Sequence, residues 1–401
     1  MAEIVVDPLE APLDRPVAVK VTGLPPDSPA TLTLSTGDRS SSAVFTADEH
    51  GVVDLTRHAP VEGDYSGVDP MGLFWSLRST GGKPGPVLLE VDGVGKVELH
   101  RLATPEGVRR TEVDALGLVG VLFEPDDEDT HPGVLVLGGS EGGLHEVDAA
   151  LLAGHGFTTL ALAYFGTPGV PEHLVDVPLE YFGKALTYLA ARAGEIGVLG
   201  GSRGGELALL LGATFSQVRA VVSVVGSGVV TQGIGPGRNL LQVLQHEAAS
   251  WTLKGEALPY LPYSVPDGLR ADVVDDVPTS LAQAFDLSDG VPEDAVIPVE
   301  KTLGGVLLLS AGDDRSWPSA ALSEVAERRL DEHDHPFPYE HVSYPDAGHL
   351  IAGPPHRPTT DVRVPGPGVV FEMGGTPSAT AAARADAWRR SLRFFSEQLG
   401  T

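Results

Sequence analysis

One serine in the chain has the surroundings of an enzyme nucleophile. Ser202 lies in the run Gly-Gly-Ser-Arg-Gly-Gly, between the apolar residues 196–199 and a helix-forming stretch that ends at Leu211. Strand, glycine-tight turn and helix in this order form a nucleophile elbow, in which small neighbours permit the strained backbone that lifts the hydroxyl clear of the sheet. The same short motif also occurs in glycine-rich turns with an ordinary serine. The assignment therefore depends on the partners of Ser202.

A serine nucleophile needs a histidine base and a carboxylate that orients the base. In the fold that carries this elbow, the carboxylate and then the histidine follow the serine, each in a loop after a strand. His349 stands after the strand candidate 339–344 and directly after a glycine, and it is the predicted base. Asp313 and Asp314 both follow the apolar run 305–310. Position in the sequence alone does not decide which of these two aspartates is the carboxylate that orients the histidine.

A second glycine-rich run, Gly-Gly-Ser-Glu-Gly-Gly at 138–143, follows the all-apolar strand candidate 133–137. It lacks the Gly-Lys-Ser/Thr ending of a phosphate loop and the Gly-x-Gly-x-x-Gly pattern, which argues against a nucleotide site. A loop after an early central strand suits the second donor of an oxyanion hole. We expect the amide of Ser140 or Gly139 to act beside the amide of Arg203, with no cofactor and no metal.

The elements that must position these residues alternate between strands and helices over residues 109–401. This rhythm predicts an α/β fold with a mostly parallel sheet. Further strands are expected at 158–163 and 218–225, and helices at 179–192 and 383–399. Between 228 and 299 the rhythm lapses, which indicates a cap or lid insertion in an α/β-hydrolase domain.

Residues 1–108 show short strand candidates separated by turn signals and no helical periodicity. This pattern predicts a separate β-sandwich domain. The strand candidates are at 16–22, 30–35, 42–46, 87–91 and 96–100, and residues 103–110 read as a linker. The apolar cluster at 69–76 is expected either to plug the core of this domain or to face the next one.

The composition of the chain limits which partners and which chemistry are compatible with it. The 401 residues carry a formal net charge of -28, which disfavours nucleic acid and anionic membrane surfaces. There is no cysteine, so disulfides, thiolate metal sites and a thiol nucleophile are excluded. The chain shows no signal peptide and no run of about 18 apolar residues, so we expect a soluble, cytoplasmic protein. The sequence does not fix the oligomeric state.

Several motifs together resemble one family. The chain is similar to the acyl-CoA thioesterase and bile acid-CoA:amino acid N-acyltransferase family, which joins an immunoglobulin-like N-terminal domain to an α/β-hydrolase domain. The motifs that carry the resemblance extend over most of the chain. They lie at 67–75, 151–157, 161–164, 179–182, 200–206, 313–317, 344–349 and 386–388.

The resemblance implies a triad of Ser202, Asp314 and His349, because the second aspartate of the family's Asp-Asp-x-x-Trp motif is the catalytic one. It also implies hydrolysis of an acyl thioester, carried by CoA or by an acyl carrier protein, through an acyl-serine intermediate. Members that conjugate amino acids characteristically use cysteine, so a serine favours water as the acceptor.

Other functions stay open at this stage. One is acyl transfer to an amine or hydroxyl acceptor, and another is an esterase or cyclase of a specialised metabolite. A binding module with an inactive hydrolase domain belongs to a different class. An anionic substrate such as CoA needs a local basic patch on so acidic a protein. Arg203, Arg238 and Lys254 are the nearest candidates in sequence.

Overall fold

The computed structural model describes residues 1–400 and divides into two compact units. The first comprises Met1–Pro105, Pro354–Asp361 and Pro377–Ala385, and the second comprises the remaining described residues. The expected boundary after residue 108 differs from this division, because strand β11 (Val108–Val113) already pairs in the sheet of the second unit. The sequence also gave no sign that two C-terminal segments belong to the first unit.

The first unit is built from β-strands in two sheets. One sheet has the order β1-β3-β6, and the other has the order β2-β10-β9-β4-β5-β7 with β8 paired to β5. Side chains alternate between buried and partly exposed along β4, as expected for a strand with one face on a core. The immunoglobulin-like relationship stays a prediction. The strands are β1 Glu3–Asp7, β2 Glu10–Pro12, β3 Ala18–Thr22, β4 Pro29–Ser35, β5 Arg39–Thr46, β6 Val53–Asp54, β7 Glu62–Gly63, β8 Arg78–Ser79, β9 Val87–Val91 and β10 Gly95–Leu102.

The apolar cluster at 69–76 forms the short helix α1 (Gly72–Trp75), and all of its residues are buried in the core of the first unit. The indole nitrogen of Trp75 donates to the Asp69 carboxylate at 2.8 Å. The ring of Tyr65 meets the Trp75 ring edge-on, with 6.0 Å between centroids. Of the two alternatives, these contacts make the cluster a core plug.

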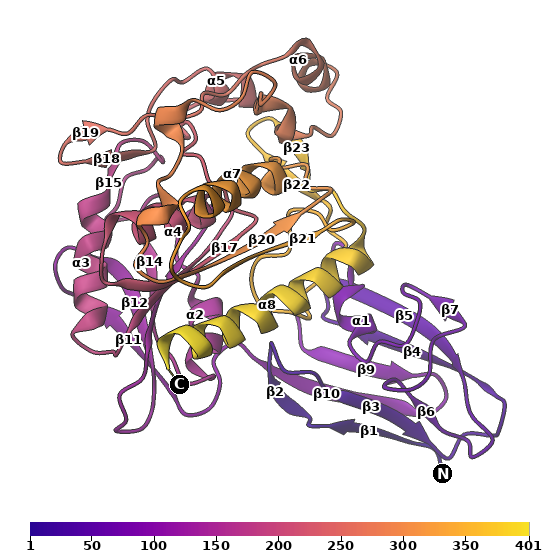
Figure 1. Cartoon of the computed structure of the whole chain (residues 1–401). Coiled ribbons are helices and arrows are strands. Elements are labelled where there is room, and N and C mark those ends of the chain that lie inside the picture. The colour runs from indigo at the N-terminus through magenta and orange to yellow at the C-terminus, as the bar shows by residue number, and fades with distance from the viewer. Residues whose placement is uncertain (401) are drawn as a thin grey trace. The chain divides into compact units, whose positions relative to one another are not determined.

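The second unit contains an eight-stranded sheet with the order β11-β12-β14-β13-β16-β17-β20-β21 (Figure 1). The strands from β14 to β21 are parallel, whereas β11 and β12 pair antiparallel at one end. This mostly parallel sheet confirms the predicted α/β-hydrolase class. Beyond β11, the strands are β12 Val119–Pro125, β13 Gly133–Leu137, β14 Thr158–Ala163, β16 Ile196–Gly201, β17 Val218–Val224, β20 Gly305–Ala311 and β21 Tyr339–Tyr344.

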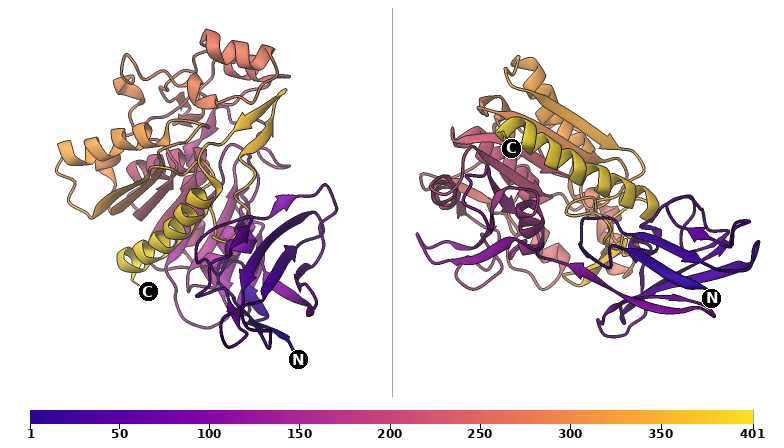
Figure 2. Two further views of the ribbon diagram at one scale, coloured as in Figure 1. Left: turned by 90° about the vertical axis from the view of Figure 1, so that its right-hand side faces the viewer. Right: turned by 90° about the horizontal axis from the view of Figure 1, so that it is seen from below.

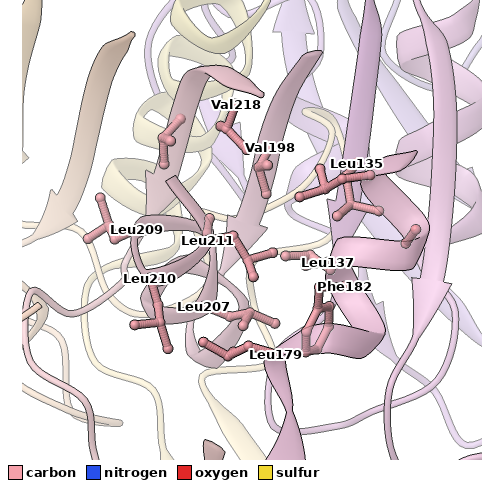
Figure 3. Close-up of a cluster of buried hydrophobic side chains, with 14 of the residues drawn as sticks. Leu135, Leu137, Leu179, Phe182, Val198, Leu207, Leu209, Leu210, Leu211 and Val218 are labelled. Carbon is pink, nitrogen blue, oxygen red and sulfur yellow. The ribbon is translucent and has the colours of Figure 1, made fainter. Parts of the chain in front are cut away.

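Three helices cover one face of this sheet and share its core. They are α3 (Leu179–Ala190), α4 (Arg203–Thr214) and α7 (Ser319–Glu332). Figure 3 shows apolar side chains of α3 and α4 gathered beneath residues of the central strands, with Leu207 and Phe182 close to Leu137. Burial of this apolar surface is the main driving force for packing the helices on the sheet.

The opposite face meets α2 (Glu146–Ala153) and the part of the C-terminal helix α8 (Pro377–Leu399) that belongs to the second unit. Thr159 on β14 donates its hydroxyl to the Ala149 carbonyl of α2 at 2.8 Å. Gly197 on β16 makes room for α8, because a Cβ there would lie 2.6 Å from the Phe395 ring. The sheet is thus covered on both faces, which is why its central strands are continuous apolar runs.

The stretch between β17 and β20 has little regular structure, as expected for residues 228–299. Its helix α6 (Asp267–Val274) and strand β18 (Trp251–Leu253) are two of several short elements, and both lie at one end of the second unit (Figures 1 and 2). The others are α5 Leu240–Leu244, β19 Glu256–Ala257, η1 Leu281–Ala284, η2 Glu293–Ala295 and η3 Val299–Lys301. Strand β18 pairs with β15 (Val177–Pro178). No helix within residues 1–400 is long and apolar enough to span a membrane.

Candidate active site

Ser202 occupies the turn between β16 and α4 and has φ 56° and ψ -122°. A positive φ is strained for a residue with a side chain, and such strain is concentrated at functional sites. Two backbone bonds hold the turn: Ser202 N–H donates to Val224 O at 2.8 Å, and Gly205 N–H donates to Ser202 O at 2.8 Å. The elbow therefore presents Ser202 at the carboxyl end of the parallel strands.

The glycines around Ser202 are required by close backbone contacts. A Cβ on Gly200 would overlap the carbonyl of Gly204, and a Cβ on Gly204 would overlap the carbonyl of Gly138. The turn from β16 into α4 and its approach to the loop after β13 therefore leave no room for side chains. This explains the residue types that the sequence shows on either side of the serine.

His349 forms hydrogen bonds with both predicted partners. Its Nε2 lies 2.9 Å from Ser202 Oγ, and its Nδ1 lies 2.8 Å from Asp314 Oδ2. Since an ionised carboxylate can only accept, Nδ1 carries the proton and Nε2 accepts from the serine hydroxyl. The ring also packs edge-on against Trp317, with 6.4 Å between centroids. Histidine is thus held in the tautomer of a general base.

Asp314 is fixed by contacts on its other oxygen. Its Oδ1 accepts the backbone N–H groups of Ser316 at 2.9 Å and Trp317 at 3.2 Å, and its side chain is 1% exposed. Asp314 is therefore oriented from the backbone of its own loop, and Oδ2 is left to face the imidazole.

Asp313, the alternative carboxylate, points elsewhere. Its Oδ2 accepts the N–H of Gly375 at 2.9 Å, and its Oδ1 pairs with Arg315 at 3.3 Å. Its side chain is 47% exposed. The structure therefore brings Asp314 to the histidine and leaves Asp313 in a loop contact at the surface.

The surroundings of His349 alter its basicity. Burial by itself lowers the pKa of the imidazole, but the charge and hydrogen bond of Asp314 outweigh burial and raise the pKa above its usual value. The negative charge of Glu141 contributes in the same direction. The surroundings of His349 thus favour the protonated form of its imidazole.

The three expected oxyanion donors differ in their present bonding. Within residues 1–400, no hydrogen-bond acceptor is found for the N–H of Arg203 or of Ser140. The N–H of Gly139 instead donates to Glu141 Oε1 at 3.2 Å. Two of the named amides therefore have no acceptor among the described residues, and the third donates to a carboxylate of its own loop.

The side chain of Arg203 is not available to a substrate phosphate, contrary to the expectation from its position in the sequence. It is 3% exposed and pairs with Glu206 at 2.8 Å. Its Nη2 donates to Gln232 O and to Ser250 Oγ, each at 2.6 Å. Arg238 and Lys254, the other two basic candidates, are exposed.

Glu206 is a neighbour of the site that the sequence analysis missed. It is fully buried, and it accepts from Trp251 Nε1 at 2.8 Å and from Thr231 Oγ1 at 2.6 Å in addition to Arg203. Its signal in the sequence is that it is the one charged residue in the apolar run that follows the elbow. Through Glu206, the irregular stretch after β17 is bonded to the helix that starts at the nucleophile.

A second serine, histidine and carboxylate lie in line elsewhere in the sheet. Ser310 Oγ is 2.8 Å from His341 Nε2, and His341 Nδ1 is 2.7 Å from Glu327 Oε2. Ser310 lies within strand β20 and is fully buried, so its hydroxyl has no route to a substrate. These bonds tie β20, β21 and α7 together. No group of side chains that could hold a metal ion is found among the described residues.

Comparison with known proteins places this chain in a family. Residues 177–401 match the profile described as BAAT / Acyl-CoA thioester hydrolase C terminal, and residues 14–92 match the Acyl-CoA thioester hydrolase/BAAT N-terminal region. Acyl-coenzyme A thioesterase 1 of Homo sapiens is 32% identical over 422 residues, covering 96% of this chain and 94% of that protein.

Two further proteins are similar. Peroxisomal succinyl-coenzyme A thioesterase of Mus musculus is 30% identical over 421 residues, covering 97% of this chain and 94% of that protein. The crystal structure of a putative dienelactone hydrolase from Klebsiella pneumoniae aligns with a TM-score of 0.44 and 18% identity, over 72% of this chain and 98% of that one. On the profile matches and the full-length relatives, this chain belongs to the acyl-CoA thioester hydrolase/BAAT family.

Proposed function

We propose that the protein is a serine hydrolase that cleaves acyl-CoA thioesters, with Ser202 as nucleophile, His349 as base and Asp314 as the orienting carboxylate. The observation that carries the proposal is the unbroken line of hydrogen bonds from Ser202 Oγ through the imidazole to Asp314 Oδ2. The substrate class follows from the thioesterases to which the chain is 30% identical or more over nearly its full length.

In the first half of the reaction, His349 Nε2 takes the hydroxyl proton while Ser202 Oγ attacks the carbonyl carbon of the thioester. The carbonyl oxygen becomes an oxyanion, for which the Arg203 amide and an amide of the loop 138–143 are the donors. The C–S bond then breaks, the imidazolium returns its proton to the leaving thiolate, and the acyl group remains as an ester of Ser202.

In the second half, water takes the place of the thiol. His349 removes a proton from the water as its oxygen attacks the ester carbonyl, and a second oxyanion forms at the same donors. Collapse of this intermediate breaks the bond to Ser202 Oγ, which regains the proton from the imidazolium. The products are the free acid and the thiol, and the enzyme is unchanged.

The stretch 228–299 is proposed to cap the acyl chain. Its apolar residues Leu261 and Phe285 form one buried cluster with Trp317, whose ring touches His349. An acyl chain attached to Ser202 needs an apolar surface of this kind close to the histidine. The cytoplasmic location expected from the sequence stays a prediction.

Two related activities remain candidates because the same acyl-serine serves both. In one, an amine or hydroxyl acceptor takes the place of water in the second half of the reaction. In the other, the acyl group arrives on an acyl carrier protein or as a simple ester in place of acyl-CoA in the first half. The exposed Arg238 and Lys254 are the basic residues from the sequence analysis that are still free to meet a phosphate.

The test is a panel of acyl-CoAs, acyl carrier protein thioesters and simple esters, with free thiol measured by a colour reagent and acyl products by mass spectrometry. We expect free thiol and free acid in equal amounts from acyl-CoA. Turnover of the esters alone would overturn the thioesterase assignment. Failure of a fluorophosphonate probe to label the protein would identify it as a binding module with an inactive hydrolase domain.

A further inference from the structure

The loop after β13 places a carboxylate beside the nucleophile. Glu141 Oε1 accepts the N–H of Gly139 at 3.2 Å, on the loop where an oxyanion donor is expected. A Cβ built on Gly139 would lie 2.7 Å from Glu141 Oε2 and 3.2 Å from Ser202 Cβ. The carboxylate and the serine therefore face each other across Gly139.

Glu141 is held there by a cation. His145 Nε2 lies 2.8 Å from Glu141 Oε1, and His145 Nδ1 lies 3.7 Å from Asp148 Oδ2. Burial lowers the pKa of His145, but the two carboxylates overcome this and raise it to about 10, so the ring is an imidazolium at neutral pH. Its ring also fills the space above Gly138, where a Cβ would lie 2.5 Å from Cδ2.

This arrangement conflicts with the reaction proposed for Ser202. A carboxylate oxygen on the Gly139 amide competes with a substrate oxygen for that donor, and its negative charge opposes an oxyanion forming next to it. Glu141 has an alternative position, because its side chain is 58% exposed and is tied to His145 rather than enclosed. Rotation toward solvent frees the amide without burying a charge.

We propose that Glu141 covers the Gly139 amide, one donor of the oxyanion site, in the free enzyme and is displaced when the carbonyl of the acyl group binds. The inference rests on the proposed function in taking Ser202 as the nucleophile and the Gly139 amide as an oxyanion donor. The product of hydrolysis is itself a carboxylate, so the returning side chain of Glu141 also competes with the free acid and expels it. Glu141 is thus a positioning residue that acts through the Gly139 amide.

The experiment measures how fast an uncharged fluorophosphonate labels the full-length protein, because the phosphoryl oxygen needs the same amides as a substrate carbonyl. We expect Glu141→Ala to be labelled about three- to tenfold faster than wild type, and Glu141→Gln to fall between them. The matched control is Glu146→Gln, which removes a nearby carboxylate paired with Arg110 at 2.7 Å and should stay within about twofold of wild type.

Competition between an added carboxylate and the probe provides a second measurement. Protection by the carboxylate would not change if Glu141 had only a structural role. Hexanoate, a simple carboxylate product, should protect Glu141→Ala from labelling at a concentration about three- to tenfold lower than it protects wild type. Labelling of both Glu141 variants at or below the wild-type rate, or unchanged protection by hexanoate, would overturn the proposal. Absence of any labelling in wild type would instead count against Ser202 as nucleophile, so the two failures are distinguishable.

Discussion

Trp251 donates its indole N–H to Oε1 of Glu206 at 2.8 Å, which bonds the irregular stretch after β17 to the helix that begins at the nucleophile. Glu206 also balances the charge of Arg203 inside the protein. One buried ion pair therefore connects Arg203, whose amide is a proposed oxyanion donor, to the proposed acyl cap. Disrupting this ion pair is expected to lower the free energy of unfolding more than it lowers the rate of the reaction.

Glu206→Gln leaves the Arg203 guanidinium buried without a counter-charge. Removing one partner of a buried ion pair typically costs about 3–5 kcal/mol. We expect the free energy of unfolding, measured by urea denaturation, to fall by this amount. Glu256→Gln is the control, because Glu256 is exposed in strand β19. A loss below about 1 kcal/mol in Glu206→Gln would show that the ion pair contributes little to stability.

Ser202→Ala is expected to abolish turnover and probe labelling while the protein stays folded, since only the attacking oxygen is removed. Loss of a triad member typically costs several orders of magnitude in rate. Ser310→Ala is the matched control, because Ser310 has the same pair of partner types but lies buried within β20. It should keep full labelling. Activity of Ser202→Ala within about tenfold of wild type would refute the nucleophile assignment.

Two neighbouring aspartates provide a direct test of the third triad position. Asp314→Asn should lower kcat by about a thousandfold or more, because the amide favours the wrong tautomer of His349 and does not stabilise the imidazolium. Asp313→Asn should cost far less, since Asp313 contacts Gly375 and Arg315 at the surface. Steady-state kinetics of the two variants shows which aspartate is the third member of the triad. The reverse ranking would move the triad by one residue.

Much of this fold was predictable because its central strands are buried on both faces. The strands β13, β14, β17 and β20 lie at the expected residues, since near-complete burial leaves long apolar runs. Strand β21 also lies at the expected residues, although it is an edge strand and none of its residues is fully buried. Strand β11 was missed, and part of it was taken for linker. Its residues are mostly exposed and include Arg109, Arg110 and Glu112, so pairing at a sheet edge leaves no apolar pattern.

The candidate site was predictable only in part. The order of Ser202, Asp314 and His349 along the chain follows from the fold that the elbow belongs to. The bond between Glu141 and the Gly139 amide depends on the path of a loop with two positive-φ glycines, Gly142 and Gly143, which no periodicity reveals. The contacts of Glu206 with Thr231 and Trp251 were equally hidden, because these two partners are distant from it in sequence.

The raised pKa of His349 sets the acid limb of the pH profile. Only the neutral imidazole accepts a proton, so kcat/KM should fall as pH drops through a pKa above about 6.5, the usual value for histidine. The groups that face the ring are Asp314, Glu141 and Ser202, and both carboxylates favour the protonated form. Glu141→Ala should therefore shift the midpoint to lower pH. A midpoint that stays in place would show that Glu141 does not act on the histidine.

The last prediction concerns the acceptor. An acyl-Ser202 ester is less reactive toward amines than a thioester of cysteine, so water is expected to win in the wild-type enzyme. Ser202→Cys should shift the product toward the amide when glycine or taurine is supplied in excess. The measurement is the ratio of conjugate to free acid by mass spectrometry, with Ser310→Cys as the control for adding a thiol elsewhere.

The outcome in the wild-type enzyme decides the class of reaction. Mostly conjugate from wild type would replace the thioesterase assignment with a transferase, because it would show that a bound amine reaches the ester carbonyl before water. A product in which the substrate's own amine or hydroxyl has attacked would indicate a cyclase. Since Trp317 of the apolar cluster touches His349, the residues proposed to enclose the acyl chain would then also control which nucleophile reaches the base.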